Sequence, residues 1–229
     1  MFRVLRTVPP TMMAKFFTVT LISFVPWHSL HGVRNNSLKK AARYRGEKPR
    51  PDLPKREELE ATSRRFTVKY LLGVMNSGSA RDFLRANRRS NIHLYPDDWK
   101  KLPIPDVSAE QQRPVVQVVD LILALQRYFH AHPKHRTALD TVLLEFLENL
   151  NDALVRELYT PDDLHARSLH FGRFVAEARL PAITAIRDAA HLEEVRKALE
   201  KASDINAPLR AALFDLGSLT MTEQAAANV

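Results

Sequence analysis

Hydrophobic positions in the first hundred residues predict a mixture of strand, helix and extended chain. Residues 17–25 are apolar, rich in β-branched and aromatic side chains, and alternate imperfectly, which predicts a strand near the start of a sheet. Apolar residues at helical spacing predict one helix over 66–75 and a second over 79–88, with Ser79 as its N-cap. The proline-containing residues 91–107 predict an extended segment that packs on a domain edge.

From residue 108 the pattern is helical throughout. Ser108 and Gln111 form a capping-box signature at the start of a strong amphipathic helix, which Pro133 breaks. A second amphipathic helix is predicted over 137–159. Thr160 and Pro161 have the residue types of an N-cap and a first helical position, and predict a third helix. Further helices are predicted from 180, over 191–201 and over 207–216.

These patterns predict an α+β protein that is mostly helical, with residues 1–107 and 108–229 as its two domains. The first would hold a few strands and two helices, and the second would be a helical bundle. Hydrophobic residues make up 45% of the chain and charged residues 26%, which is a globular composition. The absence of cysteine excludes disulfides, cysteine-rich zinc sites and a cysteine nucleophile, and fits the reducing cytoplasm, where we expect the protein.

The sequence contains no apolar run of 18 residues that predicts a membrane-spanning helix. Arg3, Arg6 and Lys15 precede an apolar stretch at 16–26, which superficially resembles a signal peptide. That stretch is rich in Phe, Thr, Val and Ile, and no small-residue cleavage site follows it. We therefore favour the strand and expect no membrane partner.

Positive charge is concentrated in the first half of the chain. Residues 1–101 hold 21 Lys and Arg against 8 Asp and Glu, a net charge of +13, whereas residues 102–229 hold 13 against 18, a net charge of −5. A basic segment of this size indicates a polyanionic partner. Nucleic acid is the commonest such partner, and an anionic membrane surface is the alternative.

The strongest chemical feature is a basic loop at 34–45, followed by a segment at 46–56 that holds three prolines and predicts a long exposed loop. Lysine and arginine neutralise phosphates, while arginine and asparagine can also read guanine and adenine edges. The alternative is a solvated basic loop without a ligand.

No complete catalytic or metal-binding motif is evident. The sequence has no glycine-rich phosphate loop, no Gly-x-Ser-x-Gly, no His-Glu-x-x-His and no Asn-Pro-Pro-Tyr. Asp97 and Asp98 precede a lysine as in some nuclease sites, but they are better explained as caps of a helical turn. His165 and His170 are five residues apart, which suits chelation from one helix face poorly. His130, His132 and His135 have no acidic residue nearby in sequence, so we expect no metal site in the chain.

Five segments of the chain, taken together, resemble one known family. They are residues 24–40, 69–77, 92–105, 110–125 and 151–159, and they follow one another in the family's order. The family is the TaqI-like specificity domains, which recognise the target of adenine-specific DNA methyltransferases and of fused restriction–modification enzymes. The resemblance implies double-stranded DNA as a partner, and a methyltransferase domain or subunit as another. It implies that S-adenosylmethionine, and Mg²⁺ if it is used, bind the full enzyme or partner and not this chain.

The chain departs from the family in lacking the methyltransferase domain and the first half of the recognition domain. The resemblance therefore implies a C-terminal fragment of such an enzyme, in which residues 1–107 form a partial recognition domain and no residue of this chain is catalytic. The DNA-binding residues would be Arg34, Asn35 and Asn36 for base readout, and Lys39, Lys40, Arg43, Arg45, Arg85, Arg88 and Arg89 for phosphates. Two alternatives are a helical assembly module that docks on a methyltransferase or nuclease subunit, and a non-functional remnant that cannot fold.

Overall fold

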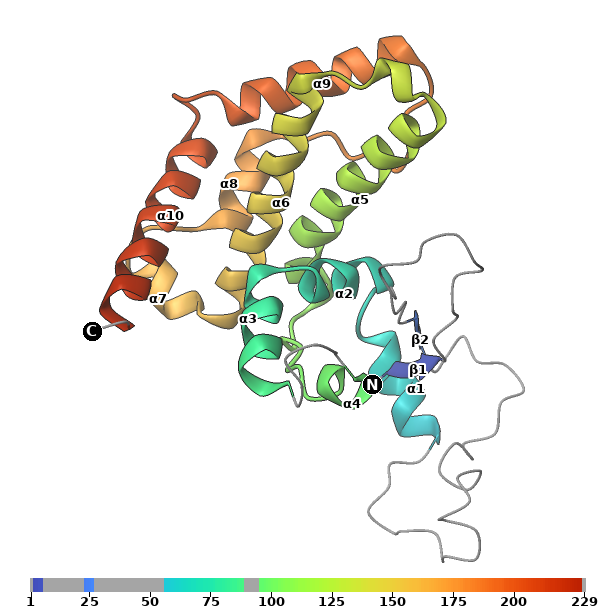
Figure 1. Ribbon diagram of the computed structural model, residues 1–229, viewed down its shortest axis with the longest axis vertical. Helices are drawn as coiled ribbons and strands as arrows, with labels where there is room; N and C mark the ends of the chain where they lie inside the picture. Colours follow the sequence, from blue (N-terminus) through green and yellow to red (C-terminus); the bar gives the residue numbers. More distant parts are fainter. Residues whose placement is uncertain (1, 6–22, 27–55, 89–94, 228–229) are drawn as a thin grey trace, which may run out of the picture. The chain divides into compact units, whose positions relative to one another are not determined.

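The structure is a computed structural model that describes residues 2–5, 23–26, 56–88 and 95–227 (Figure 1). The chain divides into two compact units. The first contains Met1–Phe66 and Ala86–Leu102, and the second contains Thr67–Arg85 and Pro103–Val229. The eight candidate DNA-binding residues Arg34, Asn35, Asn36, Lys39, Lys40, Arg43, Arg45 and Arg89 lie outside the described residues.

The described part of the first unit contains two very short strands and two helices. Strand β1 (Phe2–Leu5) pairs antiparallel with β2 (Ser23–Pro26), with Phe2 opposite Pro26 and Leu5 opposite Ser23. The helices are α1 (Arg56–Arg64) and the single turn α4 (Pro96–Trp99). Asp98 caps that turn, because its Oδ2 accepts a hydrogen bond from the Tyr95 amide at 2.9 Å, as expected from the sequence.

The predicted α+β class is wrong, because the described chain is mainly a helical bundle. The only strands among the described residues are β1 and β2, four residues each, which pair with each other alone. A two-stranded ribbon of this length has too little surface to serve as a sheet layer on which helices pack. Most of the apolar run that predicted a strand, residues 17–22, lies outside the described residues, and only its end is in β2.

In the second unit, all the described secondary structure is helical. They are α2 (Val68–Met75), most of α3 (Gly78–Asn87), α5 (Ala109–Ala131), the 3₁₀ helix η3 (Pro133–His135), α6 (Ala138–Tyr159), α7 (Pro161–His165), α8 (Phe171–Ala178), α9 (Ala189–Ser203) and α10 (Pro208–Ala227).

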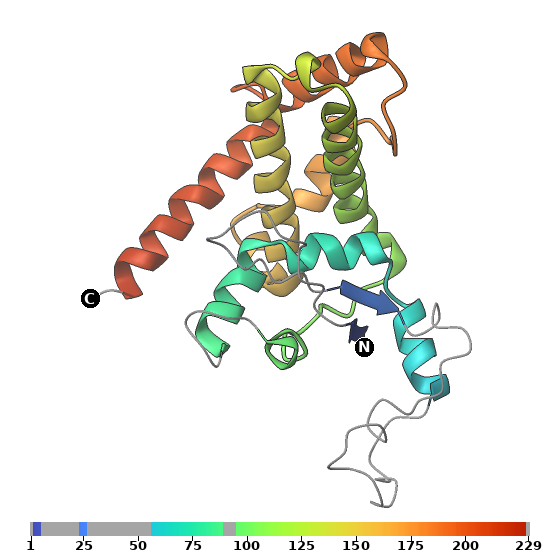
Figure 2. The same cartoon turned by 45° about the vertical axis from the view of Figure 1, so that its right-hand side comes forward.

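The core of this unit lies between α5 and α6, which run side by side and antiparallel (Figures 1 and 2). Pro133 ends α5 and begins η3, and the chain returns as α6. Helices α2, α8, α9 and α10 pack around this pair. The apolar stripes of α5 and α6 are fully buried, at Leu121 and Leu125 of α5 and at Leu143, Leu147 and Leu150 of α6. Hydrophobic burial along these two long helices is therefore the main source of stability.

The helix ends follow local rules, with two corrections to the sequence prediction. The capping box is confirmed: Ser108 Oγ accepts from the Gln111 amide at 3.2 Å, and Gln111 Oε1 accepts from the Ser108 amide at 3.0 Å. The predicted N-cap Ser79 is instead inside α3, because the Ser77 hydroxyl accepts the hydrogen bond from the Ala80 amide. The helix predicted from residue 180 does not form, because residues 180–188 are not helical; the separate helix predicted over 191–201 is confirmed as α9, whose N-cap Asp188 accepts from the His191 amide.

Candidate functional site

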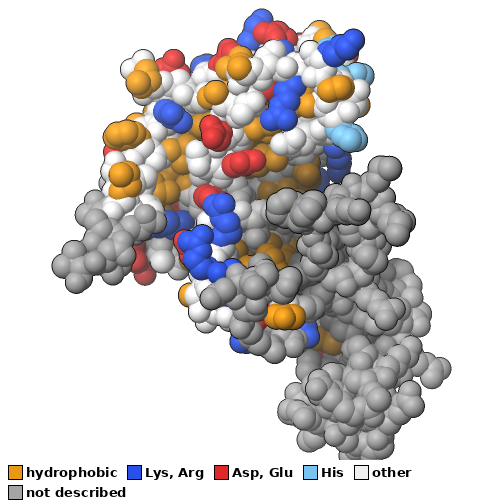
Figure 3. Space-filling model, in the orientation of Figure 1, with side chains coloured by type: hydrophobic (Ala, Val, Ile, Leu, Met, Phe, Trp, Pro, Cys, Tyr) orange, Lys and Arg blue, Asp and Glu red, His pale blue; other side chains and the backbone are white. Residues whose placement is uncertain are grey.

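Helix α3 carries an exposed pair of arginines on one face. Arg81 and Arg85 are four residues apart, so their side chains project from the same side of the helix. Their side chains are 69% and 75% exposed, and Figure 3 shows Lys and Arg side chains gathered where α3 lies. Arg81 is 3.4 Å from the Asp152 carboxylate, and Arg85 is 3.9 Å from that of Asp82. Exposed pairs of this kind contribute little, so both guanidinium groups can exchange them for a phosphate.

The start of α3 is fixed to α6 through a single carboxylate. Asp152 Oδ1 accepts from the Gly78 amide at 3.0 Å, and a side chain at Gly78 would place its Cβ 3.1 Å from Asp152 Oδ2. Burial raises the pKa of the Asp152 carboxyl, although the bond from Gly78 and the charge of Arg81 act in the opposite direction. Asp152 therefore holds the N-terminal turn of α3, and with it Arg81, in a defined position against α6.

Two of the arginines predicted from the sequence can be placed. Arg85 is exposed, as a phosphate contact requires. Arg88, which follows α3, is only half exposed, and its Nε is buried without a hydrogen-bond partner among the described residues. Arg81 was not among the predicted contacts. The signal that identifies it is its spacing of four from Arg85, which places both residues on one helix face.

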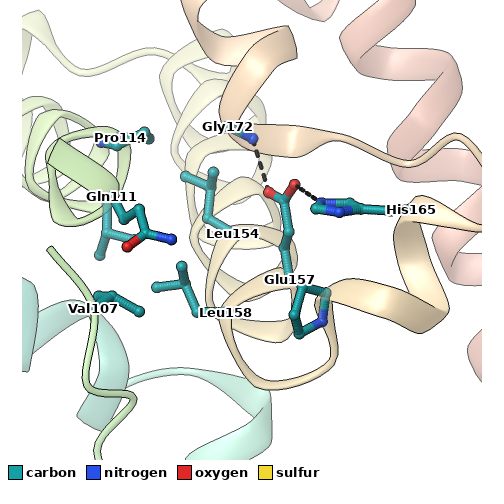
Figure 4. Close-up of a pocket in the computed structure, with 10 residues that line it drawn as sticks. Val107, Gln111, Pro114, Leu154, Glu157, Leu158, His165 and Gly172 are labelled. Carbon is teal, nitrogen blue, oxygen red and sulfur yellow. Dashed lines mark hydrogen bonds and ion pairs between the residues drawn. The ribbon is translucent and has the colours of Figure 1, made fainter.

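A pocket of about 240 Å³ lies within the second unit, where the start of α5 faces the end of α6 (Figure 4). Its walls are largely apolar. Its lining residues are Val107, Gln111, Pro114, Val115, Leu154, Glu157, Leu158, Pro161, His165 and Gly172. Pockets with apolar walls and a few convergent polar groups are the usual form of small-ligand sites.

Glu157, near the end of α6, is the centre of the polar groups at this pocket. Its Oε1 lies 2.9 Å from His165 Nε2, and its Oε2 accepts from the Gly172 amide at 2.8 Å (Figure 4). The His170 ring stacks on that of His165, with ring centroids 4.4 Å apart. Ligand atoms of Glu157, His165 and His170 all lie within 4.8 Å of one another.

The backbone between the two histidines explains why the sequence did not reveal this cluster. A continuous helix would place residues five apart on poorly matched faces, but α7 ends at His165. Ser168 has a φ of 61°, in the left-handed region, and the Leu169 amide donates to the Leu164 carbonyl at 3.0 Å. This helix-terminating turn reverses the chain and returns His170 over His165. The third helix predicted to start at Pro161 is therefore the short helix α7, and α8 follows it as a separate helix.

The other histidine group has a structural role. Tyr128 Oη lies 2.9 Å from His135 Nδ1, and the His132 and His135 rings stack with centroids 5.4 Å apart. These contacts tie the end of α5 to η3. Within the described part of the chain, Glu157, His165 and His170 are the only group of three such side chains with ligand atoms close enough to hold one metal ion.

Comparisons with family models, with curated proteins and with solved structures find no match to this chain. Membership of the TaqI-like specificity domains therefore stays a prediction from the segments quoted above. In the described residues, no helix combines the length and the apolar character that crossing a membrane requires.

Proposed function

We propose that this protein is the DNA-recognition part of a cytoplasmic adenine-specific DNA methyltransferase or restriction–modification system. The observation that carries the proposal is the division of charge, +13 over residues 1–101 against −5 over the rest. The exposed arginine pair Arg81 and Arg85 supports it, because two guanidinium groups on one rigid helix face suit neighbouring phosphates.

In this proposal the work is divided between the two parts of the chain and a partner. Arg81 and Arg85 contact phosphates and set the register of the protein on the duplex, while Arg34, Asn35 and Asn36 read base edges. A methyltransferase domain or subunit binds S-adenosylmethionine, flips the target adenine and transfers the methyl group. The acidic residues 102–229 do not favour phosphate contact, which suits them for the methyltransferase side of the assembly.

A second candidate function, a helical assembly module, is supported by helix α10. Phe214 and Met221 on this helix are 75% and 73% exposed, and their spacing of seven places them on one face. Large apolar side chains exposed together are typical of protein–protein contacts. In this alternative the basic half would be incidental to function.

The arginine pair can be tested by charge removal. We expect the double variant Arg81→Gln, Arg85→Gln to bind mixed-sequence duplex DNA more weakly at low salt, by about tenfold, because two phosphate contacts are lost. The slope of log affinity against log salt should fall by roughly 2. Fluorescence anisotropy at several salt concentrations measures both quantities.

The matched control is Arg173→Gln with Arg187→Gln, which removes the same charge from exposed positions in the acidic half of the chain. This control should leave the slope unchanged. Equal loss of affinity in both double variants would show a response to net charge alone and would contradict a specific role for α3.

A further inference from the structure

We propose that Glu157, His165 and His170 form a binding site for a divalent transition-metal ion, with Zn²⁺ as the ion that this ligand set fits best. Two imidazole nitrogens and one carboxylate oxygen are a common zinc ligand set when three protein ligands leave a fourth position open. The proposal is independent of DNA binding, because none of these residues belongs to the arginine pair on α3.

The three ligands already lie close to the required arrangement. Their ligand atoms fall within 4.8 Å of one another, and Glu157 Oε1 lies 2.9 Å from His165 Nε2. Ligands about 2.0–2.1 Å from a tetrahedral ion lie roughly 3.4 Å apart. The separations between ligand atoms therefore have to change by no more than about 1.4 Å for the three atoms to hold one ion.

Glu157 is held by a helix and a backbone hydrogen bond, whereas His165 and His170 are brought together by a turn. Glu157 projects from α6, the longest helix of the acidic half after α5, and its Oε2 is held by the Gly172 amide at 2.8 Å. That bond orients the carboxylate and leaves Oε1 directed at His165, in the manner of the outer hydrogen bonds that fix metal ligands. His165 and His170 flank the left-handed turn at Ser168, which brings their rings together.

The metal-binding cluster lies beside the pocket, so the open fourth position on the ion faces a space that can hold a ligand. Glu157 and His165 line the apolar pocket beside α5 and α6, so a fourth ligand on the ion would be a water molecule or a polar group of a molecule held in that pocket. The apolar walls at Leu154, Leu158 and Pro114 restrict water around such a group. The site is thus suited to a small molecule with an apolar body and one donor atom.

The alternative to a metal site is a simple hydrogen bond between Glu157 and His165, whose Oε1 and Nε2 atoms are 2.9 Å apart. The experiment below separates the two, because a hydrogen bond alone produces neither a stoichiometric titration with metal nor a visible absorption spectrum.

The test is titration of the full chain with ZnCl₂ by calorimetry and with CoCl₂ by visible absorption. We expect one equivalent to bind and Co²⁺ to show the intense absorption bands of a four-coordinate site. His170→Asn and Glu157→Gln should each weaken binding by more than about 100-fold, because each removes a direct ligand, whereas loss of an outer contact costs 10–100-fold.

Controls keep the result interpretable. His132→Asn alters the separate His132–His135 stack and should leave metal binding unchanged. Glu157→Gln keeps an oxygen that can accept the Gly172 bond, and circular dichroism and thermal unfolding without metal should show that this variant is folded. The proposal is overturned if no equivalent binds, if binding persists in folded His170→Asn or Glu157→Gln, or if it is lost in His132→Asn.

Discussion

Replacing Arg196 with methionine is expected to lower the free energy of unfolding by about 3 kcal/mol at pH 7. Arg196 on α9 forms a two-pronged ion pair with Asp140 at the start of α6, with Nε 2.8 Å from Oδ1 and Nη2 2.7 Å from Oδ2. The Asp140 side chain is only 1% exposed. Removing the arginine therefore leaves a buried carboxylate without its cation, which is more costly than the loss of a surface pair.

The hydrogen bonds that Asp140 keeps in this variant hold the loss of stability at the lower end of the range for buried pairs. Asp140 Oδ2 still accepts from the Thr137 amide and hydroxyl, at 2.7 and 2.9 Å. Arg196 Nη2 also donates to the His135 carbonyl at 2.8 Å, so the variant loses a link between α9 and the connection that precedes α6. Chemical denaturation measures the change, and Arg173→Met, which breaks an exposed pair with Glu177, should have little effect.

The pH dependence of the same variant follows from the carboxyl group. Burial acts to raise the pKa of Asp140, but hydrogen bonds from Arg196 and Thr137 outweigh it, and the pKa lies below its ordinary value of 3.8. The unfolded chain therefore binds more protons than the folded chain in acid, and this contribution to stability is lost as the pH falls through the folded pKa. The difference between wild type and Arg196→Met should shrink from pH 7 to pH 3. A difference that stays constant would contradict the ion pair as its cause.

Gly73→Ala is expected to destabilise the helical unit by about 2–3 kcal/mol through steric conflict. A Cβ at Gly73 of α2 would lie 2.5 Å from Val115 Cγ1 and 2.8 Å from Asn151 Oδ1. Both neighbours belong to the two core helices, and the Asn151 amide donates to the Gly73 carbonyl at 3.0 Å. The new methyl group therefore separates α2 from α5 and α6, although alanine favours helix more than glycine does.

The matched control for Gly73→Ala is Gly217→Ala in α10, where a Cβ would meet no atom within 4 Å. This control should stabilise the protein by up to about 1 kcal/mol, from helix propensity alone. Combining Gly73→Ala with Val115→Ala should cost less than the two changes added together, because the second removes the methyl group that the first strikes. Purely additive losses in thermal or chemical unfolding would argue against this close contact.

Sequence patterns predicted the helices with strong local signals and missed features that depend on chain reversal. Ser108 and Gln111 marked the start of α5, and Pro133 marked its end, because caps and prolines act within a few residues. The start of the third helix was predicted at Thr160 and Pro161, but its end at His165 was not, because the left-handed residue that follows is Ser168 and not a glycine or asparagine. The Leu180–Pro181 step wrongly predicted a helix, whereas the helix predicted over 191–201 is α9, which begins two residues earlier, after its N-cap Asp188.

The candidate sites differ in how much the sequence could reveal. Basic composition identified Arg85, and helical spacing links it to Arg81, because both are local properties. The cluster of Glu157, His165 and His170 needs two helix ends and a turn to meet, and no local pattern encodes that meeting. For the same reason, the close approach at Gly73 is visible only once α2 is packed on α5.

The most direct test of the proposed DNA-recognition function is titration of the purified full chain against labelled mixed-sequence duplex DNA at several salt concentrations. We expect binding at low salt whose log affinity falls steeply and linearly with log salt, since the basic half releases counterions from phosphates. Absence of binding at low salt, from a sample whose circular dichroism shows the helical fold, would contradict the DNA-recognition function and favour the assembly module.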